Sequence, residues 1–281
     1  MATLQLPGLA AFDLDAYCAR LGYTGGREPT LQTLREIQWR HVNTIPFENL
    51  ASLTGEPVPL DLPALQAKMV GSRRGGYCFE HNILFAAALE RLGFAVTGLA
   101  ARVLWKAPTD RIGARTHMLL KIELPDGAYL ADTGFGGATL PEPIEFVTGR
   151  AQATRMESFR LVPQPEGCQL EVQLPEGWQP MYSFDGQPQQ FVDYQVANWF
   201  VSTHPASRFR QVLLVARPAG GCRRTLFNGD YRQHGPGAAG ERRQVGSVSE
   251  LRQLLDEVFG IEAPQTATVE AALARILVAE G

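Results

Sequence analysis

The chain has 281 residues, of which 45% are hydrophobic and 20% charged, and its formal net charge is −3. This composition is that of an ordinary globular protein with room for a sizeable core and two or three sub-domains. It excludes a nucleic-acid binder that relies on a basic surface, and no apolar run approaches the length of a membrane-spanning helix. Nucleic acids and membranes are therefore not expected as partners.

The cysteines favour a reducing compartment. Cys18, Cys78, Cys168 and Cys222 are far apart in the sequence, with no C-x-x-C pair and no metal-ligand spacing. A disulfide framework and a metal site are therefore not expected. Residues 1–8 also lack the pattern of a signal peptide, so the expected location is the cytoplasm.

Residues 12–92 show the apolar spacing of helices. Asp13 is expected to cap a first helix and Thr30 a second, which ends before Pro46. His41 falls on the apolar face of the second helix. A structural role in the core is therefore favoured for this histidine over a catalytic one.

The segment after Pro46 is expected to be a loop formed by Phe47, Glu48 and Asn49. Glu48 is expected to pair with an arginine of the Arg73-Arg74 turn, as structural support. Phe47 either packs in the core or lines a binding pocket, and the residues alone do not decide between these roles.

Cys78 stands at the predicted start of a helix. Residues 83–92 repeat apolar side chains every three or four positions, and Gly93 supplies a left-handed stop. The pair Gly75-Gly76 breaks any preceding element. Because the N-terminal end of a helix favours the thiolate, this is a good position for a nucleophile. A small buried hydrophobe is the alternative, but the adjoining glycines and polar residues argue against it.

A cysteine nucleophile needs a base and, in most cases, a group that orients the base. His81 follows Cys78 by three residues and is the nearest candidate in the sequence. His117 opens a strand-like run, and Asp132 lies among apolar residues of the return strand. A carboxylate in such surroundings needs a partner, so His117 and Asp132 are natural partners. Both histidines remain candidates at this point.

Residues 94–190 alternate apolar and polar positions in short runs, which indicates a small barrel or sandwich. If Asp126-Gly127 is the turn pair of the hairpin, Asp132 lies opposite Lys121 and four residues from His117. That leaves roughly 13 Å between the two side chains along the strand. A bulge, a wider loop or the absence of direct pairing would resolve the discrepancy.

The loop Gly134-Phe135-Gly136-Gly137 follows Asp132 directly. It lacks the Lys-Ser/Thr element of a Walker motif. It is either a flexible turn or a place where the backbone closely approaches part of a substrate, with Phe135 free to stack on an aromatic ring.

The last third of the chain mixes helices and strands. The basic pairs Arg223-Arg224 and Arg242-Arg243 are expected to be solvated rather than to bind phosphate groups. The expected elements are a helix over 192–202, a strand over 209–215, a hairpin at Asn228-Gly229, a loop over 233–243 and a helix capped by Ser247.

Several motifs taken together resemble those of the arylamine N-acetyltransferases, from about residue 12 to about residue 260. One local departure is Thr133, where a valine is expected. The motifs are the run from Arg74 to Asn82, the strand-borne His117, the run from Asp132 to Gly137, and the flanking segments Ile45–Leu50 and Asn198–Pro205.

The resemblance implies an α+β fold with a cysteine-protease-like Cys-His-Asp core. Residues 1–93 would form an N-terminal helical bundle that carries the nucleophile. Residues 94–190 would form a small central β-barrel with the histidine and the aspartate. Residues 191–281 would form a C-terminal α/β lid.

The resemblance also assigns site residues. The triad would be Cys78, His117 and Asp132, and His81 would not be the base. The backbone of Gly134, Gly136 and Gly137 would approach coenzyme A. The acceptor pocket would be aromatic and formed by Phe47, Phe79, Val103, Trp105, Phe135 and Phe209.

The predicted function is acetyl transfer by a ping-pong mechanism, as in xenobiotic metabolism. Acetyl-CoA would acetylate Cys78, and the acetyl group would then pass to the nitrogen or hydroxylamine oxygen of an arylamine, arylhydrazine or N-hydroxyarylamine, without a metal. A cysteine hydrolase or a transglutaminase-like enzyme with the same triad is the alternative. A non-catalytic binding protein would require a broken triad, and the triad is complete in this sequence.

Overall fold

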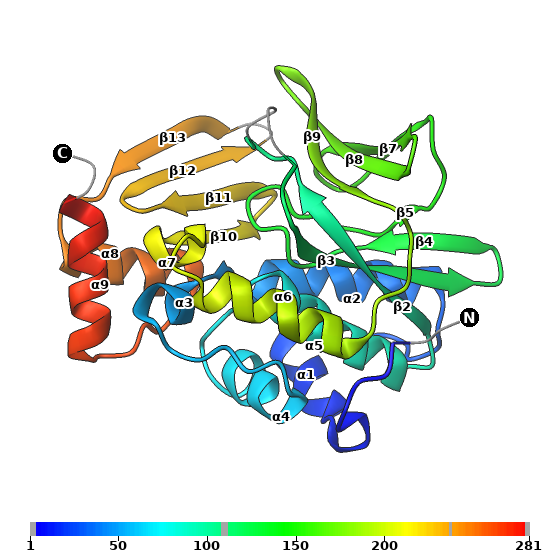
Figure 1. Ribbon diagram of the computed structural model, residues 1–281, viewed down its shortest axis with the longest axis horizontal. Helices are drawn as coiled ribbons and strands as arrows, with labels where there is room; N and C mark the ends of the chain where they lie inside the picture. The colour runs from blue at the N-terminus through cyan, green and yellow to red at the C-terminus, as the bar shows by residue number, and fades with distance from the viewer. Residues whose placement is uncertain (1–3, 108–111, 236–237, 279–281) are drawn as a thin grey trace.

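A computed structural model describes residues 4–107, 112–235 and 238–278. Within these residues the strands form an eight-stranded and a five-stranded antiparallel sheet, and Figure 1 shows helices α1 to α5 lying along one side of both sheets. The α+β class predicted from the sequence is confirmed. We propose the segments 1–93, 94–190 and 191–281 as its structural units.

The first part of the chain is helical, and its helix caps are the predicted ones. The side chain of Asp13 accepts a hydrogen bond from the N–H of Ala16, and the side chain of Thr30 accepts one from the N–H of Thr33. The helices are η1 (Leu9–Ala11), α1 (Leu14–Leu21), α2 (Leu31–Thr44), α3 (Leu50–Thr54), α4 (Leu62–Leu65), η2 (Gln66–Val70) and α5 (Cys78–Arg91).

Helix α5 is the buried axis of the molecule. Each residue from Cys78 to Leu89 is buried, so the helix is enclosed on all sides. Its first turn is capped by Glu80, which accepts a hydrogen bond from the N–H of Tyr77 at 3.1 Å. Just after its C-terminal end, Gly93 has a φ of 86°, the left-handed conformation that was predicted to stop the helix.

The eight-stranded sheet is a nearly closed barrel with the strand order β5-β4-β3-β2-β9-β8-β7-β6. Its two edges meet through the side chain of Gln152 in β6, which bonds to both backbone groups of Glu145 in β5, at 2.8 and 2.9 Å. The strands are β2 (Ala95–Val103), β3 (Arg115–Leu124), β4 (Gly127–Ala131), β5 (Ile144–Glu145), β6 (Ala151–Ala153), β7 (Ser158–Gln164), β8 (Gly167–Leu174) and β9 (Gly177–Phe184).

The register of the hairpin formed by β3 and β4 explains how Asp132 can reach His117. Leu124 pairs with Gly127, so the two turn residues are Pro125 and Asp126. The predicted turn pair, Asp126-Gly127, was therefore one residue too far along the chain. Continuing this register places Asp132 opposite Leu119, two residues from His117 on the same face instead of four. Such diagonal neighbours are roughly 7 to 8 Å apart between backbones, a distance that a histidine and an aspartate side chain can bridge.

The five-stranded sheet corrects three sequence-based expectations. Residues 47–48 form strand β1 instead of a loop, because they pair with β10. Phe209 lies in helix α7 instead of a strand, and most of the expected loop over 233–243 belongs to the hairpin of β12 and β13. The strands follow the order β1 (Phe47–Glu48), β10 (Leu214–Ala219), β11 (Cys222–Phe227), β12 (Asp230–Gly235) and β13 (Ala238–Gln244).

Helix α6 crosses in front of the junction between the two sheets (Figure 1). Tyr194 donates a hydrogen bond to the carbonyl of Leu99 in the barrel, and Asn198 accepts one from the hydroxyl of Tyr77. No helix in the described ranges is long and apolar enough to cross a membrane. The helices of this part are α6 (Phe191–Thr203), α7 (Arg208–Gln211), α8 (Val248–Leu254), η3 (Leu255–Phe259) and α9 (Ala267–Val278).

A buried ion pair joins the barrel to the five-stranded sheet and gives a test of the fold. The guanidinium of Arg223 in β11 donates to both carboxylate oxygens of Glu157, at 2.9 and 2.6 Å, and its side chain is only 2% exposed. The expectation that Arg223 is solvated was therefore wrong. Glu157→Gln leaves a buried charge without its counter-charge, so we expect the free energy of unfolding to fall by about 3 kcal/mol.

Urea denaturation measures this loss. The control is Glu145→Gln, which removes the partner of the exposed Arg150 and is expected to cost less than about 1 kcal/mol. Equal losses in the two variants would contradict a stabilising role for the buried pair.

Candidate active site

Cys78 occupies the first position of helix α5, as the sequence predicted, and its side chain is 5% exposed. Its sulfur lies 3.5 Å from the carbonyl oxygen of Thr116. The loop after β4 packs directly against this turn. A Cβ atom on Gly134 would lie only 2.6 Å from the Cα of Cys78. Only a glycine permits this approach.

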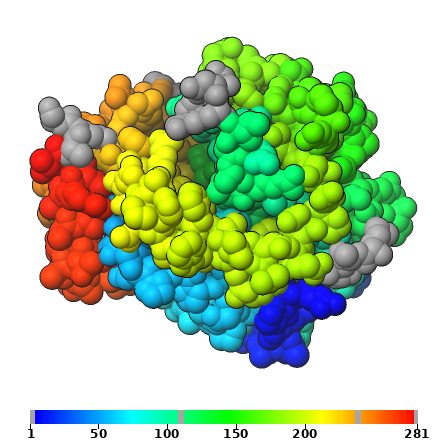
Figure 2. Space-filling model, in the orientation of Figure 1, coloured from blue at the N-terminus to red at the C-terminus, as the bar shows by residue number. Residues whose placement is uncertain are grey.

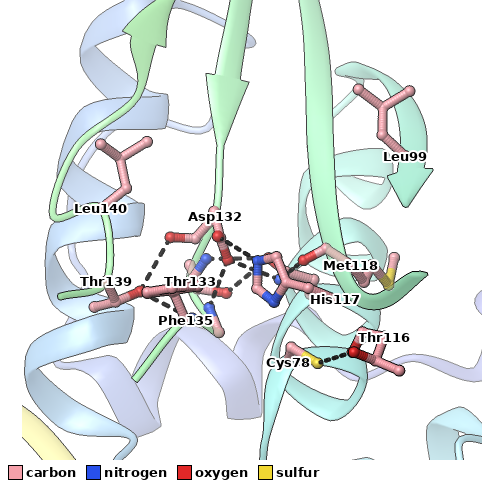
Figure 3. Close-up of polar contacts among 12 residues, drawn as sticks. Cys78, Leu99, Thr116, His117, Met118, Asp132, Thr133, Phe135, Thr139 and Leu140 are labelled. Atoms are coloured by element: carbon pink, nitrogen blue, oxygen red, sulfur yellow. Dashed lines mark hydrogen bonds and ion pairs between the residues drawn. The ribbon is translucent and has the colours of Figure 1, made fainter. Parts of the chain in front are cut away.

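His117 lies between the cysteine and the aspartate (Figure 3). Its Nε2 is 2.7 Å from Oδ2 of Asp132, which leaves Nδ1 for the thiol of Cys78. The register between β2 and β3 shifts at Thr116, immediately before the histidine. Such bulges re-aim the neighbouring side chain, here at the junction of the barrel and helix α5.

Asn82 holds the aspartate in place. Its Nδ2 donates to Oδ1 of Asp132 at 3.0 Å and to the carbonyl of Met118 at 2.7 Å, and its Oδ1 accepts from the N–H of Thr133 at 3.0 Å. Sequence reasoning did not give Asn82 this role. The available signal was its position four residues after Cys78, which places both side chains on one face of the helix.

The electrostatics favour a charged pair. Burial lowers the pKa of His117, but the carboxylate of Asp132 and the contact with Cys78 more than offset this and raise the pKa to about 10. Burial raises the pKa of Asp132, yet His117, Asn82 and the N–H of Gly134 together hold it below its ordinary value. The site can therefore hold an imidazolium beside the sulfur at neutral pH.

His81 is engaged elsewhere. Its Nδ1 lies 2.8 Å from Nε2 of His41, and its Nε2 lies 3.1 Å from the carbonyl oxygen of Pro46. Burial lowers the pKa of His81 to about 4. Both nitrogens have partners other than the thiol, so the geometry brings His117 and not His81 to Cys78. His41 is fully buried, as expected for a structural histidine.

One group of aromatic side chains lies beside His117. The ring of Phe135 meets it edge-on at 5.3 Å between centroids, and Trp105 packs on Phe135 at 6.3 Å. Tyr182 of β9 lies 4.8 Å from the His117 ring and pairs with the half-buried Val103. No local pattern pointed to Tyr182, because its strand is far from β3 along the chain.

A second aromatic group lies against the glycine loop at Gly136. Phe47 and Phe209 are half-buried and meet edge-on at 6.1 Å. Phe79 does not join them: it is 1% exposed and packs between Tyr77 and Tyr194. Because Phe79 offers no surface to a ligand, we remove it from the proposed acceptor contacts.

The glycine loop connects these groups. An added Cβ would lie 3.4 Å from Phe47 at Gly136 and 3.1 Å from Thr225 at Gly137, so the loop runs between the barrel and the five-stranded sheet. Figure 2 shows the surface hollowed between α6 and α7 on one side and the segment that follows β2 on the other. The described residues contain no group of three or more His, Cys, Asp or Glu side chains placed to hold a metal ion.

Comparisons with known proteins show which family the chain resembles. Residues 30–268 match the family model described as N-acetyltransferase. An arylamine N-acetyltransferase of Mycolicibacterium smegmatis is 41% identical over 95% of this chain and 99% of its own length. An arylamine N-acetyltransferase / N-hydroxyarylamine O-acetyltransferase of Salmonella typhimurium is 39% identical over 88% of both chains. The structure of the Mycobacterium marinum arylamine N-acetyltransferase in complex with CoA superimposes with a TM-score of 0.91 at 38% identity, covering 94% of this chain and 99% of the other.

The two histidines near Cys78 can be separated by thiol alkylation at pH 6. We expect iodoacetamide to modify Cys78 in wild type and in His81→Gln at similar rates, because His81 makes no contact that supports the thiolate. His117→Gln should react at least about tenfold more slowly, since it removes the counter-charge. Fast alkylation of His117→Gln together with slow alkylation of His81→Gln would show that His81, and not His117, supports the thiolate.

Asp132→Asn tests the orienting carboxylate with a nearly isosteric change. The amide supplies no charge to the imidazolium, so the rate of Cys78 alkylation at pH 6 should fall at least about tenfold. The matched control is Asp126→Asn in the turn of the same hairpin, where the carboxylate contacts the Tyr129 hydroxyl. Superimposable pH profiles for wild type and Asp132→Asn would make Asp132 structural only.

Proposed function

The chain belongs to the arylamine N-acetyltransferase family, and we propose that it moves an acetyl group from acetyl-CoA through Cys78 to an aromatic amine. The observation that carries the proposal is the buried Cys78–His117–Asp132 arrangement at the start of helix α5. Such an arrangement supplies a nucleophile, a base and an orienting group within one site.

The first half-reaction forms a thioester on the enzyme. The thiolate of Cys78 attacks the carbonyl carbon of acetyl-CoA, and the new C–S bond forms as the oxygen becomes an oxyanion. We expect backbone N–H groups at the start of α5 to stabilise that charge. The bond to the CoA sulfur then breaks, and the His117 imidazolium gives its proton to the departing thiolate.

The second half-reaction runs through the same groups. The nitrogen of the acceptor attacks the acetyl carbon, and neutral His117 takes its proton while Asp132 stabilises the imidazolium. Collapse of the oxyanion expels the Cys78 thiolate and leaves an amide. With an N-hydroxyarylamine the attacking atom is the hydroxyl oxygen, and the product is an ester.

The acceptor and the coenzyme would share the hollow beside the triad. Phe135 with Trp105 and Phe47 with Phe209 provide two half-buried aromatic walls that suit a planar ring. We expect the backbone of Gly136 and Gly137 to approach an arm of coenzyme A, whereas Gly134 is committed to Cys78. No metal is required in this scheme.

A cysteine hydrolase or transglutaminase-like enzyme could use the same three groups, but the family to which the chain belongs does not favour it. What separates the activities is the fate of the acyl-enzyme. A transferase must protect the thioester from water until an amine arrives, and the apolar walls around Cys78 serve that purpose. A reactive thiol also suits a reducing compartment such as the cytoplasm.

Mass spectrometry of the intact protein tests the proposal directly. Incubation with acetyl-CoA alone should add one acetyl group, located on the Cys78 peptide, and subsequent addition of 4-chloroaniline should remove it as the amide. Cys78→Ala should gain none, while the matched control Cys168→Ala should behave as wild type. Acetyl-CoA hydrolysis without an amide product would favour the hydrolase.

Phe135→Ala should affect the two half-reactions unequally. The ring contacts His117 edge-on and faces the proposed acceptor, so its loss should raise the KM for 4-chloroaniline about tenfold. The rate of Cys78 acetylation by acetyl-CoA should change by less than about threefold. Equal losses in both steps would indicate that Phe135 only packs.

A further inference from the structure

A buried chain of hydrogen bonds lies behind helix α5, and none of its members takes part in the proposed chemistry. The hydroxyl of Tyr17 is 2.6 Å from Nδ1 of His41, Nε2 of His41 is 2.8 Å from Nδ1 of His81, and Nε2 of His81 is 3.1 Å from the carbonyl oxygen of Pro46. The three side chains are at most 1% exposed. They join α1, α2 and α5 to the residue that precedes Phe47.

The carbonyl oxygen of Pro46 determines which atom donates in each of these hydrogen bonds. A carbonyl oxygen only accepts, so Nε2 of His81 carries the proton and donates to Pro46. Burial lowers the pKa values of both histidines, and each ring is neutral near pH 7. Nδ1 of His81 therefore accepts from Nε2–H of His41, and Nδ1 of His41 accepts from the hydroxyl of Tyr17. This assignment uses all four ring nitrogens.

The carbonyl at the end of this chain is held on two further sides. The N–H of Gly76 points to it at 3.4 Å, and a Cβ on Gly75 would lie only 1.8 Å from its oxygen. The peptide that leads into Phe47 therefore has little freedom. A buried polar network that is fully satisfied fixes one arrangement of its members.

Phe47 lies beside the same imidazole. Its ring lies parallel to that of His81, with 6.5 Å between centroids and 8° between planes. On its other sides it meets the edge of Phe209 and the glycine loop at Gly136. His81 thus lies beside the ring of Phe47 and holds the preceding peptide through its hydrogen bond to Pro46.

We propose that His81, oriented by its hydrogen bonds to His41 and to the carbonyl of Pro46, is a positioning residue that holds Phe47 as a wall of the acceptor pocket. The inference rests on the proposed function, in which an aromatic amine occupies that pocket. It assigns His81 to acceptor recognition and leaves acetylation of Cys78 to the triad.

Two substitutions of His81 separate the contact with Pro46 from a general loss of stability. The amide nitrogen of glutamine reaches the position of Nε2, so His81→Gln keeps the donor to Pro46. Asparagine is shorter and loses it, although its amide can still face His41. We expect His81→Asn to raise the KM for 4-chloroaniline about tenfold, the size of a lost aromatic contact, and His81→Gln to stay within about threefold of wild type.

Two further measurements show that the effect concerns the aromatic acceptor. The rate of Cys78 acetylation by acetyl-CoA, followed by mass spectrometry, should be unchanged in both variants. Deacetylation by hydroxylamine, which has no ring to place, should also be unchanged. Tyr17→Phe is the stability control: it removes the first donor of the chain but leaves the contact with Pro46, so it should lower Tm without changing the KM for 4-chloroaniline.

A double-mutant cycle identifies Phe47 as the intermediary. If His81 acts through Phe47, the rise in KM caused by His81→Asn should largely disappear when Phe47 is already leucine. Should His81→Asn not fold, His81→Leu takes its place, because it also removes the donor to Pro46 but introduces no unpaired polar group.

The outcomes are distinct. A wild-type protein that acetyl-CoA does not acetylate would overturn the proposed function and this inference with it. Normal wild-type transfer combined with equal losses in both half-reactions of His81→Asn, or with additive effects of His81→Asn and Phe47→Leu, would overturn only the positioning role.

Discussion

A charged carboxylate buried completely inside the protein is the constraint on which the rest of this structure depends. Asp132 is 0% exposed, and a charge in that position is tolerated only if its hydrogen-bonding capacity is filled. His117, Asn82 and the N–H of Gly134 fill it, and each comes from a different element. Satisfying one charge therefore brings the barrel hairpin, helix α5 and the glycine loop to a single point. That point is where Cys78 lies.

The first turn of α5 distributes its polar side chains in separate directions. Cys78 faces β3, Asn82 faces Asp132, His81 faces His41, and Glu80 faces Lys68 at 2.7 Å. A helix enclosed by apolar packing has no solvent in which to place such groups, so each must find a partner inside the protein. The proposed catalytic arrangement and the packing of the helix are in this sense the same set of contacts.

The acceptor pocket that we propose is assembled from distant parts of the chain. Phe47 comes from β1, Phe135 from the glycine loop and Phe209 from α7, and β1 is itself a strand of the five-stranded sheet. This explains why a two-residue strand matters: it joins the helical part to the last sheet and fixes one wall of the hollow. The Arg223–Glu157 pair fixes the same sheet to the barrel from the other side.

The sequence by itself determined whatever depends on near neighbours. Helix caps at Asp13 and Thr30, the start of α5 at Cys78 and the pairing partners His117 and Asp132 follow from local spacing and from the high cost of burying a lone charge. The residues by themselves left two histidines open for Cys78, and only the family resemblance pointed to His117. The tertiary structure brings His117 to Cys78, whereas His81, nearer in sequence, donates to Pro46. Only the tertiary structure decided the places of β1 and of Phe79: the strand partner of Phe47 is Ala216, and Phe79 is enclosed by Tyr194. Contacts between residues more than a hundred positions apart leave no periodicity in the chain, so no local pattern could have predicted them.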